Sequence, residues 1–343
     1  MIDKSKLICM TPFQYTEVFD NKQFLCCPGW LKEDIYETES IKDNFNSKKA
    51  QKIRESILDG SYKFCKENLC PHLSSFKKGN IPSAFKLKTH PIFKNPKPDW
   101  VVFGFDLSCN LGCPSCRSEF INFVGERRIE MDKTLDKVVE QMGDTLQGIT
   151  LCGGAEPFYS KTMMRFMREF DSTKFPKLKS IFLHTNGTLW NEKTWNLINP
   201  IQKYINECEI LIDAGTKEVY DIVRLGGDWD RLMNNLEFIK TIPTLKSIKF
   251  SFVVQQRNYK DMENFYNLIH SIMKGIDKRF TIFFNPIVEW GEFEQQNNFK
   301  EQEIHNPSHS EYQQFLEELN KIHGKPKVVH SFHDKITLKK EII

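Results

Sequence analysis

The sequence has no long hydrophobic run and no large excess of charge of either sign. No stretch of the 343 residues approaches the roughly 18 continuous apolar residues that a membrane-spanning helix needs, and the first residues, MIDKSKLICM, lack the hydrophobic region of a signal peptide. The formal net charge is only +3, with lysines scattered among acidic residues, so there is no basic patch of the kind that binds nucleic acid. We therefore expect a globular, cytoplasmic protein that binds neither a membrane nor nucleic acid.

Histidine-based metal motifs are also missing. The nine histidines show neither HxxE nor HExxH spacing, and only His184 stands out, at the end of an expected strand. Cysteines are plentiful by contrast. There are ten, and in the reducing cytosol they indicate metal or redox chemistry rather than a disulfide framework.

Three of the cysteines share one short loop. Cys109, Cys113 and Cys116 lie in the run FDLSCNLGCPSC, where Gly112 and Pro114 permit sharp turns. Three thiolates leave one iron of a four-iron cluster without a protein ligand, free to bind a substrate or cofactor. Zinc prefers four ligands in paired Cys or Cys/His sets, which this loop lacks. The loop therefore predicts a catalytic 4Fe-4S cluster.

Four further motifs follow this loop, at residues 153–157 (GGAEP), 185–188 (TNGT), 212–227 (IDAGTKEVYDIVRLGG) and 251–258 (SFVVQQRN). Together with CxxxCxxC they resemble the radical S-adenosylmethionine (SAM) superfamily over roughly residues 99–300. Two positions depart from the usual pattern: Ser115 stands where the family usually has an aromatic residue, and Ala155 where glycine is common. Neither departure removes a cluster ligand.

From about residue 100 onward, β-rich runs alternate with amphipathic helix-like runs, which predicts an α/β fold of parallel β/α units. We expect six strands, at residues 101–105, 148–152, 180–184, 209–213, 248–254 and 279–285. Six strands fit a partial (β/α)6, TIM-like barrel, in which functional groups gather at the carboxyl ends of the strands. The cysteine loop and the motifs after it fall at those ends.

The expected organisation has four parts. Residues 1–74 form a small cysteine-rich N-terminal auxiliary-cluster domain, 75–99 an extended Lys/Pro-rich linker, 100–300 the radical SAM partial barrel, and 301–343 a C-terminal helical extension with a helix at 311–322. The first part resembles the SPASM-type module that many radical SAM enzymes carry after the barrel, whereas here it precedes the barrel.

By this resemblance, four of five cysteines would hold an auxiliary iron-sulfur cluster, expected to be 4Fe-4S. The favoured ligands are Cys9, Cys26, Cys65 and Cys70, with Cys27 as the alternative to Cys26. On ligand chemistry alone, four cysteines would suit zinc equally well.

The resemblance also implies how SAM is held. Gly153 and Gly154 would let the backbone approach its methionine moiety, and Glu156 would accept a hydrogen bond from its amine. The remaining expected contacts are Ser115 near the cofactor, Arg224 with the SAM carboxylate, and Asn186, Asp213 and Gln255 near the ribose. For each of these, an ordinary structural role is the alternative.

Two cysteines are left over. Cys208 is expected at the beginning of a strand, as a buried core thiol. Cys152 lies near the carboxyl end of a strand and could donate a hydrogen atom to a substrate radical as a catalytic residue, although packing is the simpler role.

The resemblance implies that reductive cleavage of SAM gives a 5′-deoxyadenosyl radical, which abstracts hydrogen from a substrate. An electron donor such as flavodoxin or ferredoxin is then expected. A peptide or protein is the leading substrate, because the auxiliary module is common in peptide maturases. The alternatives are a small molecule, such as a sugar or aminoglycoside that is dehydrogenated or epimerised, and a non-catalytic iron-sulfur or zinc scaffold.

Overall fold

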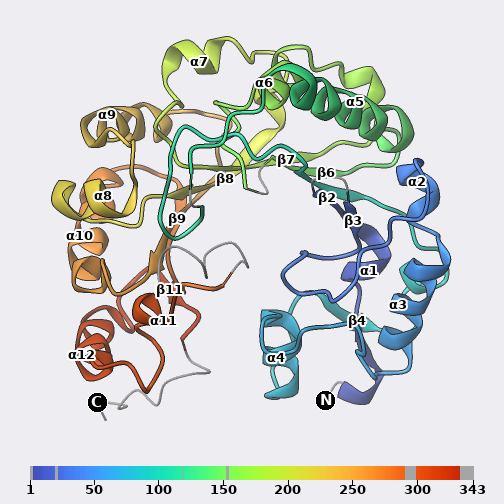
Figure 1. Cartoon of the computed structure of the whole chain (residues 1–343), viewed down its shortest axis with the longest axis horizontal. Helices are drawn as coiled ribbons and strands as arrows, with labels where there is room; N and C mark the ends of the chain where they lie inside the picture. The colour runs from blue at the N-terminus through green and yellow to red at the C-terminus, as the bar shows by residue number, and fades with distance from the viewer. Residues whose placement is uncertain (1–2, 20–21, 118, 152–153, 290–298, 333–343) are drawn as a thin grey trace. The chain divides into compact units, whose positions relative to one another are not determined.

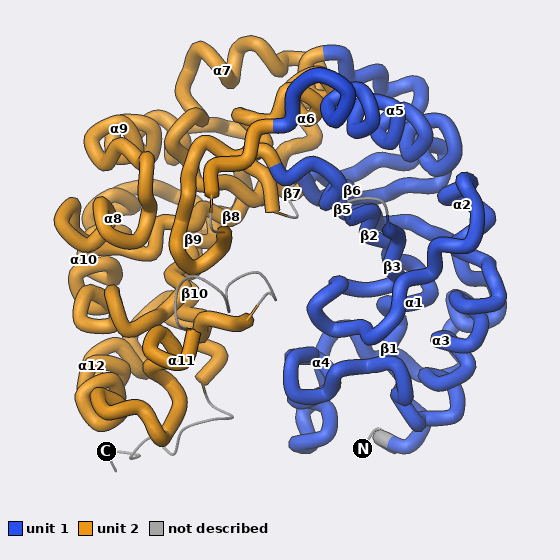
Figure 2. The backbone as a smooth tube through the Cα atoms, viewed as in Figure 1, with its two compact units in different colours: residues 1–107, 123–153, 169–181 blue, residues 108–122, 154–168, 182–343 orange. Residues whose placement is uncertain are grey.

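The computed structural model describes residues 3–19, 22–117, 119–151, 154–289 and 299–332. The chain divides into two compact units, each made of three segments (Figure 2). Unit 1 comprises residues 1–107, 123–153 and 169–181, and unit 2 comprises residues 108–122, 154–168 and 182–343. Each unit is described by itself below.

Unit 1 contains four neighbouring strands in the order β6 (Gly148–Leu151), β5 (Trp100–Gly104), β2 (Tyr15–Phe19) and β3 (Lys22–Phe24). Strand β5 pairs in parallel with both β6 and β2, and β3 is antiparallel to β2. A separate antiparallel pair joins β1 (Leu7–Cys9) to β4 (Phe85–Leu87). The helices of unit 1 are η1 (Lys4–Lys6), α1 (Thr11–Gln14), α2 (Ile41–Asn44), α3 (Lys48–Leu58), α4 (Pro71–Lys77), η2 (Pro91–Phe93), α5 (Gly125–Met142) and η3 (Ser172–Lys174).

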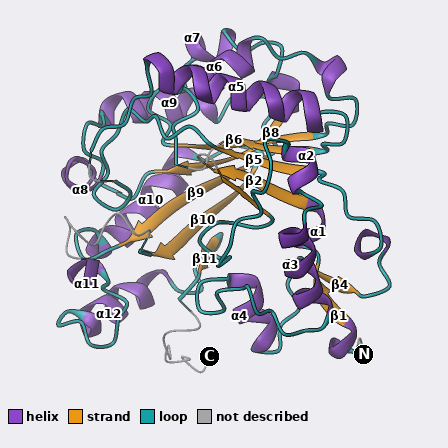
Figure 3. Cartoon of the chain, turned by 45° about the vertical axis from the view of Figure 1, so that its right-hand side comes forward, coloured by secondary structure: helices purple, strands orange, loops and turns teal. Residues whose placement is uncertain are grey.

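The long helix α5 shows why this sequence forms a covering helix. Its buried residues, Met131, Leu135, Val138 and Met142, recur every three or four positions and so lie on one side of the helix. The other positions are mostly charged or polar. Figure 3 shows this helix and the strands of both units coloured by secondary structure.

Unit 2 contains the parallel strands β8 (Ile205–Leu211), β9 (Ser247–Val254), β10 (Arg279–Pro286) and β11 (Val328–His330), in that order. Figure 1 labels β8, β9 and β11, and Figure 3 also labels β10. Strand β7 (Ser180–Thr185) begins in unit 1, enters unit 2 and neighbours β8. The helices of unit 2 are α6 (Lys161–Arg168), α7 (Glu192–Asn196), η4 (Gln202–Tyr204), α8 (Lys217–Val223), α9 (Trp229–Ile239), η5 (Tyr259–Asp261), α10 (Met262–Ile272), α11 (Phe299–Gln302) and α12 (Tyr312–Ile322).

The two faces of the unit 2 sheet differ. On one face Phe252 and Phe284 are fully buried, and both rings contact Phe265 of α10, with centroids 5.1 and 5.8 Å away. On the other face Lys249 and Phe283 are only partly buried, whereas Ser251 beside them is buried. The apolar half of each strand is therefore covered by helices, while the other half carries polar groups that remain partly accessible.

The α/β class and the largely parallel sheet are confirmed, and all six expected strands are present with small shifts at their ends. The expected position of Cys208 was wrong, because β8 begins at Ile205 and places this buried thiol in mid-strand. Residues 75–99, expected as an extended linker, hold β4 and η2, because β4 finds a pairing partner in β1. No helix in the described part of the chain has the length and apolarity to cross a membrane.

Candidate functional site

The three-cysteine loop belongs to unit 2 and is shaped by backbone hydrogen bonds. Cys109 N donates to Ile121 O at 2.9 Å, which closes the loop, and Cys116 N donates to Cys113 O at 2.9 Å in the turn between those two cysteines. Gly112 N donates to Leu225 O at 3.0 Å and so ties the loop to the segment after α8. Cys109 and Cys113 are buried, whereas Cys116 is exposed.

Each of the three sulfur atoms has a nitrogen donor from a neighbouring group. The contacts are Asn186 Nδ2 to Cys109 Sγ at 3.8 Å, Arg224 Nη1 to Cys113 Sγ at 3.5 Å and Arg117 Nη2 to Cys116 Sγ at 3.5 Å. Such donors favour thiolate over thiol, which is the form that binds metal. Burial acts the other way: it raises the pKa of Cys109 to about 12, and Glu156 adds to this rise. Burial also raises the pKa of Cys113, against Arg224, which lowers it.

The donor chemistry of this loop fits an iron-sulfur cluster. Three thiols of one loop, two buried and each facing a cationic or amide N–H, match the surroundings in which cluster sulfurs are held and tuned. Within the described residues, no three His, Cys, Asp or Glu side chains are already gathered as a metal-binding set. The fit therefore rests on the nature of the ligands and of their N–H donors.

Glu156 of the GGAEP segment organises the neighbouring TNGT turn. Its Oε2 accepts from Asn186 N at 2.7 Å, and its Oε1 accepts from Thr185 Oγ1 at 2.7 Å and Phe158 N at 3.2 Å. Burial raises the pKa of Glu156 to about 7, although the hydrogen bonds from Asn186 and Thr185 lower it. Both carboxylate oxygens thus have protein donors already. Its contact with the SAM amine stays a prediction.

Asn186 links the TNGT turn to the cysteine loop. Besides facing Cys109 Sγ, its Nδ2 donates to Asn110 Oδ1 at 3.0 Å, and its Oδ1 accepts from Thr188 Oγ1 at 2.6 Å. Asn110 Nδ2 in turn donates to Thr188 Oγ1 at 2.9 Å. This closed network fixes the cysteine loop against the end of β7.

Asp213 and Arg224, expected to bind different parts of SAM, pair with each other. Arg224 Nη2 lies 2.9 Å from Asp213 Oδ2, and the side chains are 8% and 1% exposed. Asp213 Oδ1 also accepts from Val253 N at 2.7 Å. Burial alone would lower the pKa of Arg224, but Asp213 and Cys113 outweigh it and hold that pKa above its ordinary value. Arg224 therefore stays charged and joins the carboxylate of Asp213 to the sulfur of Cys113.

The side-chain amide of Gln255 has an unsatisfied N–H donor in the described structure. The residue is 1% exposed, and its Nε2 has no hydrogen-bond partner in the described structure. The backbone around it is fixed, since Gln255 N donates to Asn258 Oδ1 at 2.9 Å and Asn258 Nδ2 donates to Asp213 O at 2.9 Å. An unpaired buried amide costs free energy unless a ligand satisfies it, which fits a contact with a bound cofactor.

The remaining expected SAM contacts are less defined. Ser115 is partly buried in the cysteine turn. Gly154 has φ +128°, a conformation that favours glycine, and its carbonyl accepts from Arg117 Nη2. Cys152 and Gly153 lie outside the described residues.

Arg117 is a candidate site residue that the sequence reasoning missed. It is 8% exposed, and its guanidinium contacts both Cys116 Sγ and the Gly154 carbonyl. Burial would lower the pKa of Arg117, but the neighbouring cysteines outweigh it and raise that pKa. The only signal in the sequence is that a cation directly follows the last cysteine of the loop.

A small cavity of unit 1 lies among the N-terminal cysteines, although their thiols are not gathered as a metal-binding set in the described residues. It is lined by four of the five thiols, Cys9, Cys26, Cys65 and Cys70, together with apolar and aromatic residues and His72. The four thiols are close enough to influence one another: after burial, the charge of Cys9 is the next cause that raises the pKa of Cys65 to about 12. Cys27 is not among the lining residues, and after burial it is Glu17 that most raises its pKa.

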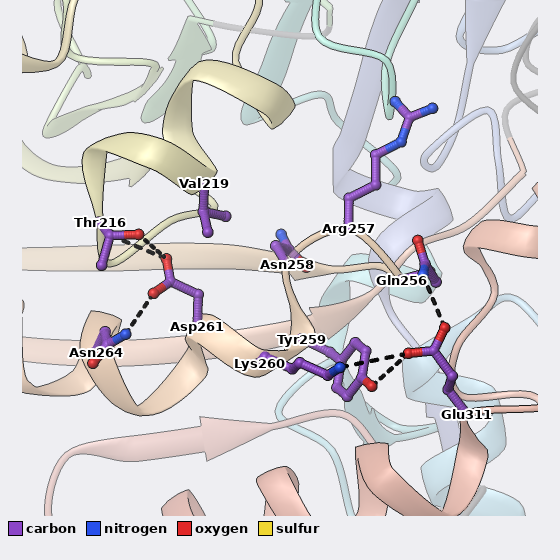
Figure 4. Close-up of a pocket in the computed structure, with 10 residues that line it drawn as sticks. All are labelled: Thr216, Val219, Gln256, Arg257, Asn258, Tyr259, Lys260, Asp261, Asn264 and Glu311. Carbon is purple, nitrogen blue, oxygen red and sulfur yellow. Dashed lines mark hydrogen bonds and ion pairs between the residues drawn. The ribbon is translucent and has the colours of Figure 1, made fainter.

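A surface pocket of unit 2 is lined by residues around the end of β9 (Figure 4). Asp261 Oδ2 accepts from Gly215 N at 2.5 Å and from Thr216 N at 3.0 Å, and Glu311 accepts from Tyr259 Oη at 2.6 Å. These bonds tie η5 to the start of α8 and to α12. The pocket is thus braced by internal bonds. Thr216 and Val219 of its lining belong to the motif at 212–227, and Gln256, Arg257 and Asn258 to the motif at 251–258, but none of the individual ligand or SAM-contact residues named from the sequence lines it.

Comparison with known proteins shows which family model this part of the chain matches. The model of the Radical SAM superfamily matches residues 107–269, which include the cysteine loop, TNGT and the Asp213–Arg224 pair. Members of this superfamily are enzymes that use a 4Fe-4S cluster and S-adenosylmethionine. A search of curated proteins finds no match.

Solved structures give weak similarity. The structure of TYW1 with a lysine-pyruvate adduct bound is similar over 62% of this chain and 70% of that chain, with 14% identity and a TM-score of 0.38. Native anSMEcpe with bound AdoMet is similar over 55% of this chain and 51% of that chain, with 18% identity and a TM-score of 0.39. The chain therefore spans about half the length of anSMEcpe.

Proposed function

We propose that this protein is a radical SAM enzyme whose 4Fe-4S cluster is held by Cys109, Cys113 and Cys116. When bound, the cluster and SAM supply a 5′-deoxyadenosyl radical that takes a hydrogen atom from a substrate. The observation that carries the proposal is that each sulfur of this loop has an N–H donor, from Asn186, Arg224 or Arg117. The match of residues 107–269 to the superfamily model supports it.

In this proposal, the chain's own residues position the cofactor and keep the cluster sulfurs charged. The buried Gln255 amide donates to SAM, and Arg224 stabilises the Cys113 thiolate while Asp213 balances its charge. Asn186 keeps the TNGT turn against the cysteine loop. Residues 100–300 would form a partial (β/α)6 barrel, with residues 301–343 as a C-terminal extension that contains helix α12 and strand β11.

We further propose an auxiliary 4Fe-4S cluster at Cys9, Cys26, Cys65 and Cys70, within a SPASM-like module of residues 1–74. The shared cavity supports these four ligands and favours Cys26 over Cys27. In this view the enzyme works in the cytoplasm with a flavodoxin- or ferredoxin-like electron donor. Its substrate would be a peptide or protein in the first instance, or a small molecule such as a sugar.

The test is anaerobic reconstitution followed by iron and sulfide counts and by measurement of 5′-deoxyadenosine after addition of SAM and dithionite. Wild-type protein should carry about eight irons and cleave SAM. Cys113→Ala should lose SAM cleavage and about four irons, whereas the matched control Cys208→Ala, a buried thiol of β8, should keep both. Cleavage that survives Cys113→Ala would refute the assignment.

The auxiliary site is tested in the same preparation. Cys70→Ala should lose about four irons while the cluster of the Cys109 loop remains, and Cys27→Ala should lose none. Unchanged iron in Cys70→Ala would contradict the auxiliary cluster, and zinc in place of iron would favour a structural site.

A further inference from the structure

A second group of polar side chains lies on the partly accessible face of the unit 2 sheet. Glu209 of β8 and Lys249 of β9 are direct cross-strand partners, and Lys249 Nζ lies 3.0 Å from Glu209 Oε1. Ser251, two residues along β9, donates its hydroxyl to the same carboxylate oxygen. Lys249 also lies over the ring of Phe283, 3.9 Å from its centroid. The lysine and glutamate are thus held in place and their charges cancel.

His184 stands beside this group, on the neighbouring strand β7. Its side chain is partly buried, and within the described part of the chain it makes no hydrogen bond. The charged groups that act on it are Glu209, Lys249 and Arg224. Burial lowers the pKa of His184, and Lys249 and Arg224 oppose its protonation while Glu209 favours it. In its neutral form the imidazole has a ring nitrogen that can accept a hydrogen bond from a ligand.

The neutralised Lys249–Glu209 pair favours a neutral ligand over a charged one. A carboxylate or an ammonium group would face a lysine and a glutamate that already neutralise each other, so it would lose hydration without gaining a free counter-charge. A hydroxyl group loses less on leaving water, and it can donate to an imidazole while accepting from an ammonium. Because Lys249 has three N–H donors, it can serve such a ligand without leaving Glu209.

We propose that His184 and Lys249 form a binding site for a neutral hydroxyl group of the substrate, with Glu209 and Phe283 positioning Lys249. The hydroxyl donates to the imidazole of His184 and accepts from Lys249 Nζ. This deepens the proposed function and rests on it, because it assigns the chemical group by which that enzyme recognises its substrate. The hydroxyl belongs to a polyol or to a serine or threonine side chain.

The test uses diethyl pyrocarbonate, which reacts with neutral, accessible histidine: a ring nitrogen attacks the reagent's carbonyl carbon, and ethyl carbonate leaves. The full-length protein, with clusters reconstituted but without SAM, is treated with the reagent, and modification of His184 is followed by peptide mass spectrometry. The exposed His90 of unit 1 serves as the internal reference. We expect His184 to react, and an unreactive His184 would overturn the proposal.

The chemical class of the ligand is identified by which compounds protect His184 from modification. At equal concentrations we compare myo-inositol, a blocked Ala-Ser-Ala peptide, its Ala-Ala-Ala twin and acetate. We expect one of the two hydroxyl probes to slow His184 modification, by about twofold at half occupancy, with the rate at His90 unchanged. Protection by inositol alone identifies a polyol, and protection by the serine peptide alone identifies a peptide. No protection by either probe, or equal protection by acetate or the alanine peptide, would overturn the proposal.

Two variants separate recognition from shielding. Lys249→Met keeps a long side chain over Phe283 but removes the N–H donor. In this variant His184 should still react with the reagent, but the hydroxyl probe should no longer protect it. Lys249→Arg should retain the protection. Lys260→Met, an exposed lysine of η5, is the matched control. Protection that survives Lys249→Met would refute the role of Lys249. The protection assay contains no SAM, so it is independent of SAM cleavage. If the protein failed to cleave SAM but the hydroxyl probe still protected His184, the proposed function would be rejected and the hydroxyl-binding site would stand.

Discussion

The buried ion pair between Asp213 and Arg224 allows a sharp prediction about stability. The two groups are 2.9 Å apart and 1% and 8% exposed, so removal of the guanidinium leaves a carboxylate buried without its counter-charge. The cost of breaking such a pair is about 3–5 kcal/mol. For comparison, the Lys217–Asp221 pair on α8 spans 3.4 Å with both side chains about half exposed, and its loss should cost about 0–1 kcal/mol.

The assay is urea unfolding of the protein without clusters, followed by tryptophan fluorescence. Because no cluster is bound, the loss of the Arg224 contact to Cys113 cannot change stability through metal binding. Arg224→Met should lower the free energy of unfolding by about 3–5 kcal/mol, and Lys217→Met by less than about 1 kcal/mol. The double variant Arg224→Met/Asp213→Asn should recover much of the loss, because it removes the unpaired charge. Asparagine also tolerates the φ of +61° at position 213.

Two results would refute this reasoning. If Arg224→Met cost no more than Lys217→Met, the pair would be accessible to water and the described burial would be wrong. If the double variant were no more stable than Arg224→Met, the loss would come from packing of the arginine side chain rather than from the unpaired carboxylate.

Three further predictions concern single positions. Gly215→Ala should destabilise the protein by about 1–3 kcal/mol in urea unfolding, because a Cβ there would lie 2.1 Å from a backbone nitrogen of α10. Asn191→Ala should cost about 1 kcal/mol, because it removes the bond that Thr194 N donates to Asn191 Oδ1 in the capping box of α7, and Asn191→Asp should cost less. Burial would raise the pKa of Glu209, but His184, once it is protonated in acid, together with Lys249 and the Ser251 hydroxyl outweighs it and holds that pKa below its ordinary value. The contribution of Glu209 to stability is therefore present above the unfolded pKa and lost as pH falls through the folded one. Melting temperatures of Glu209→Gln should therefore fall less than those of wild type between about pH 6 and pH 3, and equal falls would contradict the prediction.

The strands and the cysteine loop could be predicted because both are local signals. The six expected strands are short, largely apolar runs with helical segments around them, and the three cysteines are only a few residues apart. Strands β2 and β3 were not foreseen. They are five and three residues long, and Glu17 of β2 is 6% exposed, so an acidic residue interrupts the expected apolar pattern.

The connections among the site residues could not be predicted, because they depend on side chains far apart in the chain. Nothing in the motifs indicated that Arg224 would reach both Asp213 and the sulfur of Cys113. Likewise, Glu156 carries its motif's signature, yet its carboxylate accepts from the backbone of Asn186, 30 residues on. Only a folded chain shows which partner a buried charge finds.

The interleaved course of the chain has a consequence for biosynthesis. Unit 1 begins at the N-terminus but ends at residue 181, and its segments alternate with residues 108–122 and 154–168 of unit 2. A ribosome that adds about 5–20 residues per second would need several seconds after residue 107 before unit 1 could close. During that interval β5 lacks β6, and the nascent chain exposes an unpaired strand edge. Neither unit is therefore a continuous stretch of the chain, and the two cannot be expressed separately as continuous fragments.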